Sequence, residues 1–569
     1  MKILFEEYAY RFPYIQEIHL CPYFFFSDDG QEAWIPYVGY YFSQEINDSV
    51  FILPKVFLFE GEGDAGNGEI AFGKYRPEDI INPEGKDNPL MKDGFDNVVF
   101  NLSVWLYQAI SRYQQRHPYS GIISDAKIQN VISRRGETAE TYLDIVLSLL
   151  RFGRKHSGLF TYITILNSSG NDRIHWGKTV ARVAPTLQGR TPLYMEFINR
   201  NRSVNYDEQL VVLFYSVLNY LHSAYRFPFR PVFNYPLLRP DRIASMIETG
   251  SGTRQLRAIR RKYFKDELVA LWQILYAFFE KAESVACRNS CDEALLVHNF
   301  NMVFEDMIDD LIGDDIPEIR SLKDNRDGKR IDHIYEDSSL VRGSDIYFIG
   351  DSKYYSDSST IHGESVYKQF TYAKNIIQYS MDIFNGKGSY PRNLRYRDEL
   401  TEGYNITPNF FIRGSIRTDS IAGGKFDFQD DCLENEGKAL PDNKHFRNRL
   451  FDRDTLILQS YNINFLYVLN AYAFGTSDTG FKEKARRRFR ADVISEFNRR
   501  YDFYTVTPRK GMGLSDFVSR HFKLLNGKIY RASDADGFVY LALEHDLTSE
   551  NLKILDVVGE DAVVERVRL

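Results

Sequence analysis

Residues 345–355 have the sequence DIYFIGDSKYY. Their β-branched and aromatic residues predict a strand that Ile346 and Phe348 hold in a core. Asp351 and Lys353 are two residues apart near its end, so their side chains leave the same face. Burying a carboxylate and an ammonium is costly unless they are paired. This pair is therefore the first candidate for chemistry.

The spacing of the pair is weak evidence by itself, because the chain holds six Asp-x-Lys or Glu-x-Lys triplets. Only Asp351 closes a long β-forming run. Asp125, in GIISDAKIQN, is the best of the others because two isoleucines precede it. It lacks a preceding hairpin strand with a carboxylate. Strand context therefore selects Asp351 from among the six.

Two further carboxylates are predicted to converge on this pair. Asp332 lies in the predicted strand KRIDHIYE, 19 residues before Asp351, which suits a hairpin with adjacent strands. Glu305 lies on the apolar side of a predicted helix, ALLVHNFNMVFEDMIDDLI, that begins near residue 292. Three aspartates of that helix are predicted to face away from Glu305: Asp306, Asp309 and Asp310.

Such oxygen ligands suit Mg²⁺, with Mn²⁺ as an alternative, since Mg²⁺ binds through one or two carboxylates and a phosphate. Asp332, Asp351 and Glu305 would hold the metal, and Lys353 would orient or activate a water. Hydrolysis of a phosphodiester bond is the reaction that these groups serve. The alternative is an exposed Asp332 and a surface ion pair between Asp351 and Lys353, worth at most about 1 kcal/mol.

The order of these residues resembles the PD-(D/E)xK nuclease superfamily. Gln369, in the predicted helix ESVYKQFTYAKNIIQYSM, and Tyr372 resemble the Gln-Tyr motif of its RecB-like branch. The resemblance implies a restriction-endonuclease-like α/β fold and a positioning role for Gln369. Two departures stand out: Ile331 occupies the place of the name-giving Pro, and Tyr372 follows Gln369 by three residues rather than four.

Three other segments extend the resemblance to LlaJI-type, McrC-like restriction endonuclease subunits. They are VFILPKVFLF (50–59), RIHWGKT (173–179) followed by Pro185, and YNINFLYVLNAYAF (461–474). The resemblance implies a subunit of a two-component restriction system in anti-phage defence that cleaves double-stranded DNA. It also implies an McrB-like AAA+ GTPase as partner.

The sequence predicts a multidomain α+β protein. Its expected parts are a β-rich N-terminal domain at 1–95, a helical partner-docking region at 96–290, the α/β nuclease domain at 291–510, and a small α/β C-terminal extension at 511–569. Residues 386–450 look like a loop insertion in the nuclease domain, because they are rich in Gly, Asn, Asp and Arg.

The net charge of the 569 residues is -7, from 71 Lys and Arg against 78 Asp and Glu, so any DNA contact must be local. One basic run is expected on a helix after the nuclease core: Lys482, Lys484, Arg486, Arg487, Arg488 and Arg490. A second run is expected on one long helix at 253–286: Arg254, Arg257, Arg260, Arg261 and Lys262. Each run is either a solvated face or a surface that binds phosphates, and an acidic partner is a further alternative for the second.

Several other classes of site are disfavoured. Gly177, Lys178 and Thr179 end a phosphate-loop pattern, but Asp172 stands where its first glycine should be. A motor activity would therefore belong to a partner. Cys287, Cys291 and His298 lack a fourth zinc ligand, so buried helix cysteines are expected. The four scattered cysteines and the lack of a long apolar run predict a cytoplasmic protein without a membrane segment. A non-catalytic subunit that docks and stimulates an AAA+ motor is the rival hypothesis.

Overall fold

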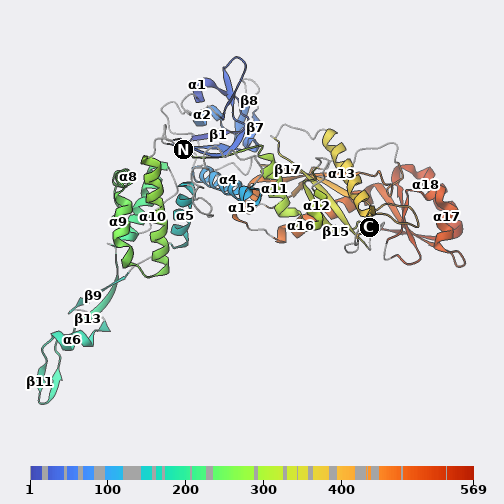
Figure 1. Cartoon of the computed structure of the whole chain (residues 1–569). Coiled ribbons are helices and arrows are strands. Elements are labelled where there is room, and N and C mark those ends of the chain that lie inside the picture. Colours follow the sequence, from blue (N-terminus) through green and yellow to red (C-terminus); the bar gives the residue numbers. More distant parts are fainter. Residues whose placement is uncertain are drawn as a thin grey trace. The chain divides into compact units, whose positions relative to one another are not determined.

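In the computed structural model the chain forms two compact units (Figure 1). The first consists mainly of residues 125–294, and the second combines 3–40, 51–124 and 295–569. The structure describes residues 2–15, 23–43, 48–61, 68–81, 96–118, 142–156, 162–168, 173–205, 208–225, 235–287, 293–323, 330–341, 344–355, 363–382, 394–416, 431, 433–436, 447–475, 479–532 and 535–569. Asp125, Asp172, Cys291 and much of 386–450 lie outside them.

The first unit is mostly helical, as predicted. Its long helix α10 packs against four others. These helices are α5 (Tyr142–Lys155), α7 (Gln209–Tyr225), α8 (Pro240–Glu248), α9 (Ser251–Ile259) and α10 (Asp266–Cys287). The single helix predicted at 253–286 is wrong, because α9 gives way to a 3-10 turn, Arg260–Lys262, and Tyr263 is extended. Burial of Tyr263 accompanies this break.

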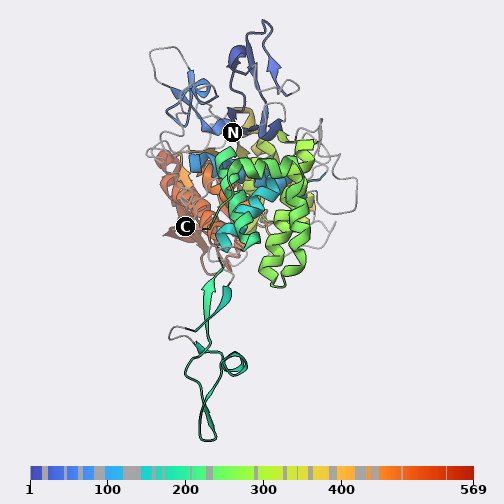
Figure 2. The same cartoon turned by 90° about the vertical axis from the view of Figure 1, so that its left-hand side faces the viewer.

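A narrow antiparallel extension leaves the helices of the first unit (Figure 2). Its stem is the sheet β10-β13-β9, and beyond the stem lie one short helix and a two-stranded hairpin. The elements are β9 (Tyr162–Asn167), β10 (Arg173–Ile174), α6 (Trp176–Arg182), β11 (Thr186–Gln188), β12 (Thr191–Leu193) and β13 (Asn199–Val204). We call this segment, residues 162–204, the finger.

The N-terminal part is rich in strands, as predicted. Its largest sheet has the order β1-β6-β5-β14, and two smaller sheets have the orders β2-β4-β3 and β7-β8. The elements are β1 (Lys2–Phe5), β2 (Tyr10–Arg11), α1 (Phe12–Ile15), β3 (Phe25–Phe26), β4 (Glu32–Trp34), β5 (Tyr37–Ser43), β6 (Asp48–Leu53), β7 (Leu58–Gly61), β8 (Gly68–Ala71), α2 (Pro77–Ile81) and β14 (Glu293–His298). The helix expected from residue 292 is therefore wrong at its start, because ALLVH completes this sheet as β14.

A five-stranded mixed sheet forms the centre of the second unit, with the order β15-β16-β17-β19-β18. The outer pairs are antiparallel and the inner pairs parallel. Its strands are β15 (His333–Ser338), β16 (Asp345–Lys353), β17 (Pro408–Ser415), β18 (Leu433–Asn435) and β19 (Ile457–Asn464). The mixed α/β class predicted for this region is confirmed.

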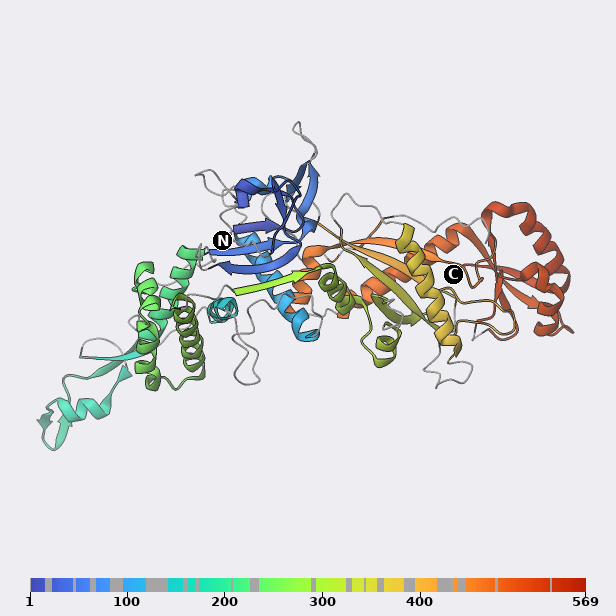
Figure 3. The ribbon, with the colours of Figure 1, turned by 45° about the horizontal axis from the view of Figure 1, so that its top comes forward.

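Helices surround this sheet (Figure 3). α11 packs on β15, β16, α15 and α16, while α13 packs on β16. The helices are α4 (Asp96–Arg116), α11 (Asn301–Ile312), α12 (Pro317–Lys323), α13 (Gly363–Asp382), α15 (Phe465–Phe474) and α16 (Thr479–Arg500). α4, although it precedes the helices of the first unit in sequence, packs on α11 and α15. An N-terminal helix thus reaches the helix that carries Glu305.

The C-terminal strands and helices follow the β-α-β-β-α-β order of ferredoxin-like motifs. Their antiparallel sheet has the order β21-β22-β20-β23. The elements are β20 (Tyr501–Pro508), α17 (Leu514–Leu525), β21 (Ile529–Tyr530), β22 (Val539–Glu544), α18 (Thr548–Asp561) and β23 (Ala562–Val567). Val506, Phe517 and Leu541 are among its fully buried core residues. β20, which begins before the predicted extension at 511–569, is a central strand of this sheet. Within the described residues, no helix is both long and apolar enough to span a bilayer.

Candidate active site

The β15–β16 hairpin brings Asp332 and Asp351 together. His333 pairs with Gly350 across the hairpin, so the residue before His333 lies next to the residue after Gly350. The Ser352 N–H donates a hydrogen bond of 3.0 Å to Asp332 Oδ2. The two carboxyl groups are close enough for the charge of Asp351 to raise the pKa of Asp332. The predicted hairpin is confirmed.

Asp351 and Lys353 form an ion pair at the end of β16. Their side chains are only 13% and 12% exposed, so this is not a surface pair. The Lys353 Nζ also lies 5.2 Å from the ring centre of Phe411, which is on the parallel neighbour β17. Because both side chains are largely buried, each charge is stabilised mainly by the opposite charge of the other. The alternative of an exposed ion pair is therefore disfavoured.

Glu305 completes a cluster of acidic groups. It lies on α11, where Asn301 Nδ2 donates to its Oε1 at 3.5 Å. Burial and the charge of Asp351 raise the pKa of Glu305 to about 7. Burial, then Glu305 and Asp351, raise the pKa of Asp332 well above its ordinary value. Each of these carboxylates therefore opposes ionisation of its neighbours, and a cation placed among them would relieve that repulsion.

The described residues contain no group of three or more His, Cys, Asp or Glu side chains that could hold a metal ion. A preformed all-protein metal site is thus absent from this part of the chain. Asp332 and Asp351 nevertheless lie side by side, and one or two carboxylates are what Mg²⁺ takes when a phosphate supplies further oxygens.

Gln369 occupies an unusual environment on α13. Its side chain is 0% exposed, and neither Oε1 nor Nε2 has a hydrogen-bond partner. An unpaired buried amide is costly. α13 packs on β16, the strand of Asp351 and Lys353. Tyr372, also on α13, is 7% exposed. Gln369 is therefore a buried polar group with unused hydrogen-bonding capacity, on a helix that packs against β16.

A chain of polar contacts that the sequence did not reveal supports the hairpin. His333 Nε2 lies 2.5 Å from Ser352 Oγ, and His333 Nδ1 lies 3.4 Å from Asp309 Oδ1. Lys323 pairs with Asp309 in turn. Burial lowers the pKa of His333. Ser352 alternates with Asp351 and Lys353 along β16, so these contacts secure the strand from its other face.

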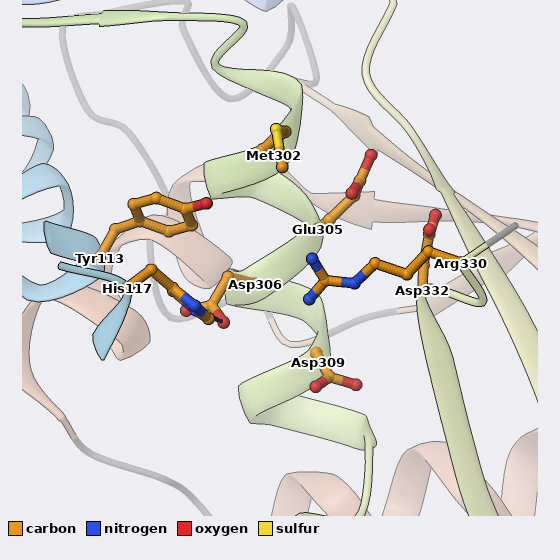
Figure 4. Close-up of a pocket in the computed structure, with 8 residues that line it drawn as sticks. All are labelled: Tyr113, His117, Met302, Glu305, Asp306, Asp309, Arg330 and Asp332. Carbon is orange, nitrogen blue, oxygen red and sulfur yellow. Dashed lines mark hydrogen bonds and ion pairs between the residues drawn. The ribbon is translucent and has the colours of Figure 1, made fainter. Parts of the chain in front are cut away.

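A small pocket opens beside the carboxylates (Figure 4). It is lined by Tyr113, His117, Met302, Glu305, Asp306, Asp309, Arg330 and Asp332. The prediction that Asp306 and Asp309 face away from Glu305 is wrong, because all three line this pocket. Residues four apart on a helix share a face, which explains Asp309. Asp310 instead forms an ion pair of 2.6 Å with Arg116 of α4.

α4 supplies one wall of the pocket. His117 Nε2 lies 2.8 Å from Asp306 Oδ1, and the Tyr472 hydroxyl donates to the same carboxylate. Burial raises the pKa of Asp306, but these hydrogen bonds and Arg116 bring it below its ordinary value. Asp306 is thus a charged structural link between α4, α11 and α15. His117 and Asp306 are 189 residues apart, and no local pattern predicts their contact.

Arg330 is a pocket residue that the sequence could have indicated. It stands two residues before Asp332, and its guanidinium group points toward α11 in Figure 4. Its charge lowers the pKa of Glu305 against the larger effects of burial and Asp351. A basic residue only two positions before a candidate metal ligand could have indicated a place in the site.

Three of the residues in the basic run on α16 donate hydrogen bonds to backbone carbonyls outside that helix. Arg486 donates to the Ile312 carbonyl at 2.6 Å and to Asp314 at 2.7 Å, at the end of α11. Lys482 donates to the Gly313 carbonyl, and Arg490 donates to the Ser339 carbonyl at 2.8 Å. These three side chains are committed to internal contacts. The other three are 60%, 81% and 54% exposed: Lys484, Arg487 and Arg488.

The other described sequence candidates, the segment 177–179 and the basic run at 254–262, lie in the first unit. Lys178 and Thr179 lie within the short helix α6, and buried Thr179 bonds to the backbone of Ile198. Trp176 is 56% exposed. On α9, Arg257 donates to the Tyr276 hydroxyl at 2.9 Å. The remaining residues of this basic run are divided between backbone contacts, a ring contact and exposed positions: Arg254, Arg260, Arg261 and Lys262.

The chain was compared with family models, curated proteins and solved structures. No family model and no curated protein matches the chain. Among solved structures, the chain is similar to one from a refined half-complex of a tetradecameric assembly of Thermococcus gammatolerans McrB AAA+ hexamers with bound McrC. That similarity covers 85% of this chain and 99% of the other, at 11% identity and a TM-score of 0.29.

Proposed function

We propose that the chain is a Mg²⁺-dependent DNA endonuclease subunit with a PD-(D/E)xK nuclease domain. The observation that carries the proposal is the convergence of Asp332, Asp351 and Lys353 at the end of one hairpin, in largely buried positions. A surface ion pair would not account for the burial or for the acidic neighbour. Phosphodiester hydrolysis accounts for both.

Each residue has a role in this proposal. Asp332 and Asp351 would hold Mg²⁺ or Mn²⁺, with Glu305 as a further ligand or a holder of water. The metal would supply Lewis acidity and lower the pKa of bound water. Lys353, held by Asp351, would orient the attacking water or stabilise charge on the phosphate. Gln369 would position the strand end or the substrate through its unpaired amide.

We further propose that the subunit acts in an McrBC- or LlaJI-like restriction system with an AAA+ GTPase. This part rests on the sequence resemblance. The finger adds a physical argument, because its tip exposes Leu187 at 70% and Met195 at 78%, and Trp176 is also exposed. Exposed apolar side chains gathered on a narrow element are typical of a protein-binding surface. An AAA+ ring is the partner to which we assign it.

The direct test is cleavage of supercoiled DNA by the chain with its partner, GTP and Mg²⁺. Asp351→Ala and Lys353→Ala should each abolish cleavage, while partner binding and circular dichroism stay unchanged. Asp315→Ala serves as a control, since Asp315 is an exposed aspartate paired with Arg320. Full activity of the Asp351→Ala variant would refute the site.

The second candidate is a non-catalytic subunit that stimulates the GTPase of the partner. The finger favours it as much as it favours the nuclease, because docking alone explains exposed apolar side chains. GTP turnover that rises with no strand breaks under any metal condition would decide for this candidate. Cleavage lost in Asp351→Ala together with unchanged GTP turnover would decide for the nuclease.

A further inference from the structure

Arg330 places a positive charge in a pocket that is lined by acidic side chains. It lines the pocket together with Glu305 and Asp332 (Figure 4). Within the described residues its guanidinium group makes no hydrogen bond or ion pair, and its charge acts on Glu305. The other arginines around α11 differ, since Arg116 pairs with Asp310 at 2.6 Å and Arg486 with Asp314 at 2.7 Å. The donors of Arg330 are therefore available to a ligand.

The side chain is also accessible. Arg330 is an exposed residue, whereas the next two positions lead into the sheet, with Ile331 at 0% exposure. An anion entering the pocket would meet the guanidinium group and the carboxylate pair together. A guanidinium group presents paired N–H donors that match two oxygens of a phosphate. A phosphate, which also ligates a metal, is the anion that suits both sides of the pocket.

We infer that Arg330 binds a backbone phosphate of the DNA in this pocket, beside the proposed metal ligands. The inference rests on the proposed function for its substrate and adds a residue that positions it. In the absence of DNA, Arg330 offsets part of the negative charge of the carboxylates. With DNA bound, the N–H groups of Arg330 donate hydrogen bonds to the phosphate. The phosphate then replaces the carboxylates as the main negative group beside Arg330.

The test is the salt dependence of DNA binding by the full chain. Binding of a labelled DNA duplex is measured at several salt concentrations with Ca²⁺ in place of Mg²⁺, and gels verify that the DNA stays intact. Each phosphate contact that is lost should reduce the slope of log K against log salt by roughly 0.9. Arg330→Gln should show that reduction, and Arg330→Lys, which keeps the charge, should keep most of the slope.

Arg320→Gln is the matched control, because Arg320 is an exposed arginine of the same unit whose guanidinium group pairs with Asp315. Its slope should equal that of the wild type. An unchanged slope in Arg330→Gln, or an equal change in Arg320→Gln, would overturn the inference. A wild-type chain that binds DNA but never cleaves it would instead overturn the proposed function, whatever Arg330 does.

Discussion

The Ser352 N–H donates to Asp332 Oδ2 at 3.0 Å, and this bond ties the end of one hairpin strand to the start of the other. It fixes Asp332 beside Asp351 without the help of a metal. A backbone donor lowers the pKa of Asp332, but burial and the neighbouring carboxylates outweigh it. The carboxyl groups are thus held in position while their negative charges disfavour one another, an arrangement that a bound cation would stabilise.

The first prediction concerns Asp332→Asn. Replacing this carboxyl group with an amide should raise the free energy of unfolding at pH 8 without metal, because burial and the neighbouring carboxylates disfavour the charged form of Asp332. Cleavage should fall on the order of 10³-fold. Mg²⁺ should raise the melting temperature of the wild type and not of the variant. Thermal melts with and without Mg²⁺ test this; a metal-free variant less stable than the wild type would contradict it.

The second prediction concerns Gln369→Leu. Both polar atoms of Gln369 are buried and unpaired, so an apolar side chain of similar size should leave stability unchanged or raise it by about 1 kcal/mol. Cleavage should nevertheless fall roughly tenfold if the amide positions substrate or water. Gln369→Glu would bury a charge and should destabilise the fold. Urea unfolding and cleavage rates measure the two effects; a large loss of stability in Gln369→Leu would show a structural role instead.

Local sequence predicted the hairpin well. The alternation in DIYFIGDSK and the 19-residue spacing depend only on neighbouring strands, so Asp332, Asp351 and Lys353 could be placed together. The wall formed by α4 could not be predicted, because His117 meets Asp306 only through long-range packing. ALLVH was ambiguous for another reason: short apolar runs suit a helix or a strand, and pairing with β5 decides for the strand.

The third prediction separates two neighbours on α16. Arg486 is 16% exposed, bonds to Asp314 and the Ile312 carbonyl, and lies 4.3 Å from the centre of the Tyr335 ring. Arg486→Gln should therefore reduce the free energy of unfolding by roughly 1–3 kcal/mol. Arg487 is 81% exposed, so Arg487→Gln should change stability by less than about 0.5 kcal/mol. Urea unfolding of both variants tests this contrast, and equal losses would refute it.

The fourth prediction concerns a buried carboxylate outside the pocket, Glu6. The Tyr354 hydroxyl donates to Glu6 Oε2 at 2.5 Å, and the Lys55 N–H donates to it at 3.2 Å. Tyr354 directly follows Lys353, so Glu6 anchors the end of β16 to the N-terminal strands. Burial raises the pKa of Glu6 from 4.5 to about 7. Above pH 7 the protein therefore holds a buried negative charge at this anchor.

Because the folded chain binds this proton more tightly than the unfolded chain, Glu6 lowers stability as the pH rises from about 4.5 to about 7. Glu6→Gln keeps an acceptor for both hydrogen bonds and removes the titration. Its stability advantage over the wild type should grow by roughly 2–3 kcal/mol between pH 5 and pH 8. Glu7→Gln is the control, since Glu7 is 52% exposed, and it should show no such growth. Urea unfolding at both pH values measures the difference. A constant gap between Glu6→Gln and the wild type would mean that Glu6 is ionised in the folded protein throughout this range.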